Sequence, residues 1–142
     1  MNSQQIDRIL KRHVGRRFQG VFSSDNLPER PTLLIANTEP ANRPGDHWVA
    51  ISVDRSGNGQ YFDSYGRPPS KTFRDYMNRH CRKKTWTYSR KQLQSAASNV
   101  CGQYCIVWCL LNSRAAVDLS RLLYTSDTGL NDSIVKEIVS RM

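Results

Sequence analysis

Residues 48–62 carry the pattern of a β-hairpin, which constrains the fold more than any other segment of the chain. Residues 48–53 alternate as expected of a strand. Residues 54–59, with the sequence DRSGNG, have the composition of a turn, and residues 60–62 return as the partner strand. An antiparallel strand pair is therefore expected near the middle of the chain.

The segments around this hairpin alternate between strand and helix patterns. Residues 32–37 (TLLIAN) are continuously apolar, as is typical of a buried strand, and residues 85–89 (TWTYS) predict a further strand. Residues 16–31 are interpreted as a turn-rich connection, and residues 92–99 as a loop. Helical spacing of apolar side chains predicts helices from Ser3 to near Gly15, from Ser70 or Thr72 to His80, from Cys101 to about Leu111, over 118–124 and, capped by Asn131, over 132–142.

These elements predict an α/β fold in which helices flank a mixed central sheet. A chain of 142 residues is long enough to bury a core of this kind, so residues 1–142 are expected to form a single domain and to act as a monomer. The charged N-terminal segment has no apolar signal-peptide core. The longest apolar run, residues 105–111, is too short to span a membrane. We therefore expect a protein that is neither secreted by a standard signal nor inserted in a membrane.

The four cysteines, at positions 81, 101, 105 and 109, do not have the spacing of a disulfide framework. Three of them lie four residues apart within one apolar segment, which favours reduced cysteines inside a cell. No second pair of Cys or His residues with ligand-like spacing accompanies them. A metal site is therefore not expected.

Positive charge is concentrated in one part of the sequence. The net charge is +9, and all of the excess lies before Cys101. Such clustering is typical of contact with a polyanion, and a solvated surface is the alternative. We expect non-specific contact with nucleic acid, because no motif for reading bases is present. The residues expected to make this contact are Lys71, Arg74, Arg79, Arg82, Lys83, Lys84, Arg90 and Lys91.

Cys101 stands at the expected start of an apolar helix, after the small-residue loop SAASNV. The partial positive charge of the first helical turn and a nearby imidazolium would lower the pKa of its thiol, as a nucleophile requires. Cys105 and Cys109, one and two turns further along, are interpreted as buried apolar residues, which is also the alternative for Cys101. Gly102 would let a substrate backbone pass close to the nucleophile.

His47 precedes one strand of the hairpin and Asp63 follows the other, so both are expected at the same end of the pair. Asp63 would accept a hydrogen bond from one ring nitrogen of His47 and leave the other nitrogen for the Cys101 thiol. Initiation of a turn is the alternative for Asp63. The arrangement predicts a general base and the residue that orients it.

Gln94 lies in the loop before the expected nucleophile. Its side-chain N–H would join the backbone N–H of Cys101 as a donor to the oxyanion of a tetrahedral intermediate, and Gln92 is the competing assignment. Trp48, beside the predicted base, would wall a narrow substrate cleft. Together these residues predict nucleophilic catalysis by a thiol.

The segments GDHWVAISVD, YFDSYG and QSAASNVCGQYC resemble the adenain family of adenovirus-type cysteine proteases, in the clan that also holds the SUMO-processing proteases. A His-Trp pair, an acid before an aromatic-Gly pair, and a Gln seven residues before Cys-Gly occur in that family in the same order. The likeness covers roughly residues 3–112. Two features depart from it: the acid is Asp63, where adenoviral members commonly carry Glu, and little chain follows the nucleophile helix.

The resemblance implies a cysteine endopeptidase that cleaves virion precursor proteins at Gly-containing sites, in the virion and the host nucleus, with Cys101, His47 and Asp63 as its triad. It also implies stimulation by DNA and by a peptide cofactor that can form a disulfide with the enzyme. Cys81 lies in roughly the region of the cysteine that forms this disulfide. Two alternatives are an isopeptidase that removes a ubiquitin-like modifier and a non-catalytic, basic DNA-binding virion protein.

Overall fold

The computed structural model describes residues 1–42, 47–82, 85–114, 118–124 and 126–142. The elements follow one another in the order α1 (Ser3–His13), β1 (Phe18–Phe22), β2 (Leu33–Asn37), β3 (Trp48–Val53), β4 (Gly59–Phe62), α2 (Lys71–His80), β5 (Trp86–Tyr88), α3 (Cys101–Arg114), the 3-10 turn η2 (Leu119–Arg121) and α4 (Thr128–Ser140).

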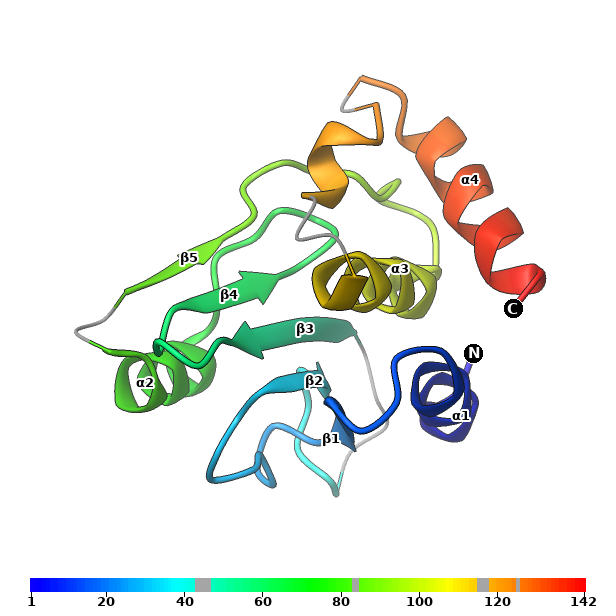
Figure 1. The fold of residues 1–142 in the computed structure, drawn as a ribbon. Coiled ribbons are helices and arrows are strands. Elements are labelled where there is room, and N and C mark those ends of the chain that lie inside the picture. Colours follow the sequence, from blue (N-terminus) through cyan, green and yellow to red (C-terminus); the bar gives the residue numbers. More distant parts are fainter. Residues whose placement is uncertain (43–46, 83–84, 115–117, 125) are drawn as a thin grey trace.

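Within the described residues, five strands form one mixed sheet in the order β1-β2-β3-β4-β5. The two outer pairs, β1 with β2 and β4 with β5, are parallel, whereas β2, β3 and β4 are antiparallel neighbours. Helix α2 covers one face of the sheet, and α1, α3 and α4 lie on the other (Figure 1). The expected α/β fold, with helices flanking a mixed sheet, is confirmed.

Two apolar cores lie on the two faces of the sheet, because successive side chains of a strand point in opposite directions. Leu34 and Ile51 pack on the α2 side, whereas Leu33 and Ala50 pack on the α3 side. Helix α3 is apolar around most of its circumference because it is buried between the sheet and the helices α1 and α4. The first residue of this central helix is Cys101.

The hairpin predicted for residues 48–62 is present, with Ala50 opposite Phe62 and Val53 opposite Gly59. Its turn is closed by Asp54, which accepts from the backbone N–H of Gly57. The positive φ of Gly57, 85°, is a conformation that glycine adopts without a steric penalty. The turn lies at one end of the strand pair, so His47 and Asp63 lie at the other.

Residues 18–22 form a strand, so the interpretation of residues 16–31 as a turn-rich connection was wrong over β1. The alternation of apolar side chains is broken there by Gly20, whose φ is 137°, and the pairing with β2 shifts register between Phe18 and Val21. A glycine at such an irregularity weakens the strand pattern that a sequence displays.

The C-terminal helix begins earlier than the sequence pattern suggested. Its N-cap is Asp127, whose side chain accepts from the backbone N–H of Leu130 at 3.0 Å, whereas Asn131, the predicted cap, is fully buried inside the first turn. Residues 118–124 form only the 3-10 turn η2, capped by Asp118. The burial of Asn131 is explained by the hydrogen bonds it makes to other segments, described below.

Candidate active site

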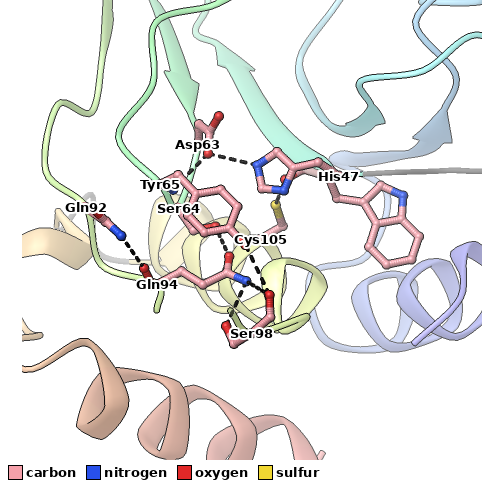
Figure 2. Close-up of polar contacts among 9 residues, drawn as sticks. His47, Asp63, Ser64, Tyr65, Gln92, Gln94, Ser98 and Cys105 are labelled. Carbon is pink, nitrogen blue, oxygen red and sulfur yellow. Dashed lines mark hydrogen bonds and ion pairs between the residues drawn. The ribbon is translucent and has the colours of Figure 1, made fainter. Parts of the chain in front are cut away.

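The ends of the hairpin bring His47 and Asp63 together. Nε2 of His47 lies 2.8 Å from Oδ1 of Asp63, and both side chains are largely buried (Figure 2). The same carboxylate oxygen accepts a second hydrogen bond, from the backbone N–H of Tyr65, at 2.8 Å. Two donors therefore hold the Asp63 carboxylate in one orientation toward the imidazole.

Cys101 lies at the N-terminus of α3, where the partial positive charge of the helix acts on its sulfur. The side chain of His47 interacts with this thiol and lowers its pKa. Because Asp63 engages Nε2 of that ring, Nδ1 is the nitrogen left for Cys101. The backbone groups of Trp48 and Gly102 also lower the pKa of this thiol.

These contacts favour the charged forms of Cys101 and His47. Burial works against an imidazolium, but the hydrogen bonds with Asp63 and Cys101 outweigh it and raise the pKa of His47 to about 9. Burial also works against a thiolate, and the contacts with His47, Trp48 and Gly102 overcome it and lower the pKa of Cys101 below its ordinary value. The pair is therefore suited to exist as a thiolate beside an imidazolium.

The other two cysteines of α3 have the opposite character. Cys105 and Cys109 are fully buried, and loss of solvent raises the pKa of each thiol above its ordinary value. Sγ of Cys105 donates to the backbone carbonyl of Trp48 at 3.4 Å, as a protonated thiol does. Of these three cysteines, only Cys101 has surroundings that stabilise a thiolate.

Gln94 lies in the loop before α3, but its side chain is already committed. Its Oε1 accepts from the Ser64 hydroxyl at 2.6 Å, and its Nε2 donates to the carbonyl and the hydroxyl of Ser98, at 3.1 and 3.0 Å (Figure 2). Gln92 is exposed and donates to the Gln94 carbonyl at 3.1 Å. Neither N–H of the Gln94 amide is therefore free in this arrangement, contrary to what a simple oxyanion donor requires.

The space beside the Cα of Gly102 is taken up by neighbouring side chains, and passage of a substrate backbone near this glycine stays a prediction. A Cβ at this position would lie 3.0 Å from Cε3 of Trp48 and 3.3 Å from Cδ1 of Ile6, because the indole ring lies directly over the glycine. The missing side chain of Gly102 lets Trp48 pack against the start of α3. Trp48 lines the cleft described next.

A cleft with a volume of about 420 Å³ opens beside the Cys101 sulfur. The sequence patterns had assigned no role to Tyr65 or Arg67, which lie in its wall. The Tyr65 ring lies 5.0 Å from the imidazole of His47, and its hydroxyl donates to the Ser98 carbonyl at 3.1 Å. The aromatic residue that follows the acid in YFDSYG was the available signal. The cleft is lined by Met1, His47, Trp48, Tyr65, Arg67, Ser98, Asn99 and Cys101.

A buried polar network ties helix α4 to the loop that carries Gln94. The Leu93 carbonyl accepts from the Tyr104 hydroxyl at 2.9 Å and from Nδ2 of Asn131 at 3.1 Å. Oδ1 of Asp132 accepts from the backbone N–H of Ser95 at 3.3 Å and lies 2.7 Å from the Tyr104 hydroxyl. These contacts join segments far apart in the sequence, which no local pattern predicts.

The basic residues expected at a DNA interface lie on α2 and around the edge strand β5. Lys71 pairs with Asp75 at 2.7 Å, and Lys83 and Lys84 lie outside the described residues. Arg74 and Arg79 lie on α2. The remaining three lie near the ends of β5: Arg82 is beside Gly57, whereas the backbones of Arg90 and Lys91 lie beside Gly66. The exposed members of the set are Lys71, Arg74, Arg79, Arg82, Arg90 and Lys91.

Cys81 ends helix α2 and is 6% exposed. Its sulfur lies where a Cβ at Gly59 would stand, and burial raises the pKa of its thiol. A disulfide between Cys81 and a peptide cofactor stays a prediction, and it would require this contact to open.

Among the described residues, no three His, Cys, Asp or Glu side chains are grouped as metal ligands. No described helix has the length and apolar character needed to cross a membrane.

Comparison with known proteins relates the chain to proteases by structure alone. No protein-family model matches the sequence, and no curated protein is similar to it. The crystal structure of the ASFV pS273R protease matches 92% of this chain with a TM-score of 0.66 at 19% identity, and its selenomethionine form matches 93% with a TM-score of 0.64 at 19% identity. This chain covers 63% and 64% of those two chains, a little under two thirds. The chain therefore shares the fold of the ASFV pS273R protease.

Proposed function

We propose that this protein is a cysteine endopeptidase in which Cys101 is the nucleophile, His47 the general base and acid, and Asp63 the residue that orients His47. One observation carries the proposal: Nε2 of His47 lies 2.8 Å from the Asp63 carboxylate, and the same imidazole lowers the pKa of a thiol at the N-terminus of α3. A thiol, a base and an orienting acid in this order are what thiol catalysis requires. The fold shared with a viral cysteine protease supports the same reading.

The reaction proceeds in two steps through an acyl-enzyme. The Cys101 thiolate attacks the carbonyl carbon of the scissile bond, and the oxygen takes up negative charge. When the intermediate collapses, the C–N bond breaks and the His47 imidazolium gives its proton to the leaving amine. Neutral His47 then takes a proton from water, whose oxygen attacks the thioester. The second tetrahedral intermediate releases the new carboxyl group, and Cys101 returns as a thiolate beside the His47 imidazolium.

The oxyanion would lie near the first turn of α3, where the backbone N–H of Cys101 is one donor. We propose that the Gln94 amide is the second donor and that it gives up one of its bonds to Ser98 when a substrate enters. Its anchoring supports this role, because Ser64 holds Oε1 at 2.6 Å and so fixes the direction of the amide.

The proposed substrates are virion precursor proteins cleaved at Gly-containing sites, in the virion and the host nucleus. Trp48 supports a preference for glycine, because its indole ring occupies the space above Gly102 and narrows the cleft beside Cys101. A Gly-Gly tail would also fit such a site, so removal of a ubiquitin-like modifier is the alternative substrate within the same chemistry.

The test is cleavage of a fluorogenic Leu-x-Gly-Gly peptide by purified variants. Cys101→Ala is expected to abolish turnover, whereas the matched variant Cys105→Ala, one helical turn away, retains most of it. An equal loss of turnover in both variants would contradict the assignment of Cys101 as the nucleophile. Turnover of SUMO or ubiquitin C-terminal fluorogenic substrates, compared with the peptide, separates the isopeptidase from the endopeptidase.

We also propose that double-stranded DNA binds the basic residues of α2 and the segments beside β5 and stimulates cleavage. Support comes from their exposure and from their spread along the sheet edge, since Arg82 lies near Gly57 and Arg90 near Gly66. Cleavage should be measured against salt with and without duplex DNA, because phosphate contacts weaken steeply as salt rises. If added DNA changes nothing at low salt, these residues are only a solvated surface.

A further inference from the structure

We propose that Arg67 selects substrates that carry a carboxylate group close to the scissile bond. The inference rests on the proposed protease function and adds a substrate class to it. Arg67 lines the same cleft as Cys101 and His47, so a peptide bound there would pass its guanidinium group.

Arg67 is held against the catalytic residues by a stack of side chains. Its guanidinium carbon lies 4.6 Å from the centre of the Tyr65 ring, and that ring lies 5.0 Å from the imidazole of His47. The Tyr65 hydroxyl in turn donates to the Ser98 carbonyl, which joins the ring to the loop before α3. A guanidinium over a tyrosine ring is attracted by the electrons of the ring face and keeps its N–H donors in the ring's neighbourhood.

The backbone at Arg67 is rigid on both sides. Gly66 has a φ of 74° and donates its N–H to the Asp63 carbonyl at 2.8 Å, and a Cβ at this glycine would lie 2.7 Å from the backbone of Lys91. Pro68 and the buried Pro69 follow, and a residue before proline is confined to extended conformations. Little further ordering is therefore needed when Arg67 binds a ligand.

In the part of the chain that the structure describes, Arg67 has no ion-pair partner. Among the described residues, no Asp or Glu lines the cleft. Asp63 is buried and hydrogen-bonded to His47. A guanidinium with free donors beside a cleft binds a carboxylate well, because the two groups match in charge and in planar, two-pronged geometry.

The carboxylate could belong to an Asp or Glu side chain or to the C-terminus of a peptide. The experiment uses Leu-x-Gly-Gly peptides with blocked ends in which Asp, Asn or Lys stands in turn at each position flanking the scissile bond. A parallel set has a free C-terminus. At low salt we expect kcat/KM for Asp to exceed that for Asn by about fivefold to tenfold at one position. If a free C-terminus raises kcat/KM but Asp and Asn peptides with blocked ends are cleaved equally, the carboxylate is that of the chain end.

The matched variants are Arg67→Glu and Arg55→Glu. Both change the net charge equally, but Arg55 is exposed in the β3–β4 turn, at the end of the hairpin opposite His47. Arg67→Glu is expected to abolish the preference for Asp and to favour Lys, whereas Arg55→Glu keeps the preference of the wild type. Two results would overturn the proposal: wild-type cleavage that neither Asp nor a free C-terminus improves, or an Arg67→Glu variant that keeps the wild-type preference.

Peptide binding separates failure of this proposal from failure of the protease assignment. Fluorescence anisotropy with the Cys101→Ala variant needs no turnover. We expect the Asp peptide to bind about fivefold more tightly than the Asn peptide, and Arg67→Glu in the same background to remove the difference. If the wild type cleaves nothing but this difference is seen, the protease function fails and the carboxylate site stands. If neither Asp nor a free C-terminus tightens binding, the carboxylate site fails.

Discussion

Nε2 of His47 and Oδ1 of Asp63 lie 2.8 Å apart at the open end of a hairpin whose turn is at its other end. The carboxylate favours the charged imidazole, and the charged imidazole in turn favours the Cys101 thiolate. The protonation state of the nucleophile therefore depends on Asp63 through its contact with His47.

Activity should depend on pH as a bell-shaped curve. Activity rises with pH as the Cys101 thiol loses its proton, at a pH below the ordinary pKa of a thiol. It falls near pH 9 as the His47 imidazolium loses its proton. Asp63→Asn keeps the size of the side chain but removes its charge, so the pKa of His47 falls and the alkaline limb moves to lower pH. The measurement is kcat/KM from about pH 5 to 10. An alkaline limb that does not move would show that Asp63 does not control His47.

Replacement of Gln94 should reduce catalysis without altering the nucleophile. If its amide stabilises the oxyanion, Gln94→Ala lowers kcat by about 10²- to 10³-fold. The reactivity of the Cys101 thiol toward iodoacetamide stays near that of the wild type, because Gln94 bonds to Ser64 and Ser98. Gln92→Ala is the control, since that side chain is exposed. Similar losses in both variants would remove the special role of Gln94.

Two glycines with positive φ should differ in their tolerance of alanine. Gly15 has a φ of 87° and open space around it, so Gly15→Ala should lower the free energy of unfolding by about 1 kcal/mol. Gly66→Ala adds a clash with the Lys91 backbone, and we expect a loss of about 3 kcal/mol or more. Urea denaturation of both variants measures the difference. Equal losses would mean that the 63–66 turn is not packed as described.

The network from α4 should stabilise the loop that carries Gln94. Asn131→Ala removes two hydrogen bonds: the one that the side chain donates to the Leu93 carbonyl and the one that it accepts from the Tyr124 backbone N–H. A loss of about 2 kcal/mol in the free energy of unfolding is expected. Ser133→Ala, an exposed change on the same helix, should stay within about 0.5 kcal/mol of the wild type. Thermal and urea melts provide the test, and a stable Asn131→Ala variant would contradict it.

Local sequence patterns predicted the parts of the site that depend on strand and helix ends. His47 and Asp63 flank two strands joined by a clear turn, so their proximity follows from pairing in the hairpin. Cys101 follows from the start of an apolar helix. The mixed sheet and its flanking helices follow from the same patterns, except for β1, where Gly20 interrupts the alternation.

The rest of the site depends on contacts between segments that are distant in the sequence. The commitment of the Gln94 amide to Ser98 is set by how one loop folds on itself, and the ring stack of Tyr65 by the path of the chain after β4. The packing of Trp48 over Gly102 joins a strand end to a helix end. Side-chain directions of this kind are decided by tertiary packing, which residue spacing alone does not contain.

The most direct test of the account is the rate at which each cysteine reacts with iodoacetamide at neutral pH, measured residue by residue by mass spectrometry. Cys101 is predicted to react fastest, and His47→Ala to slow it, because the thiolate depends on the imidazolium. Cys105 and Cys109 are predicted to react only when the protein unfolds. If Cys101 reacts no faster than Cys81, or is indifferent to the loss of His47, the thiolate–imidazolium pair does not exist and the proposed mechanism is wrong.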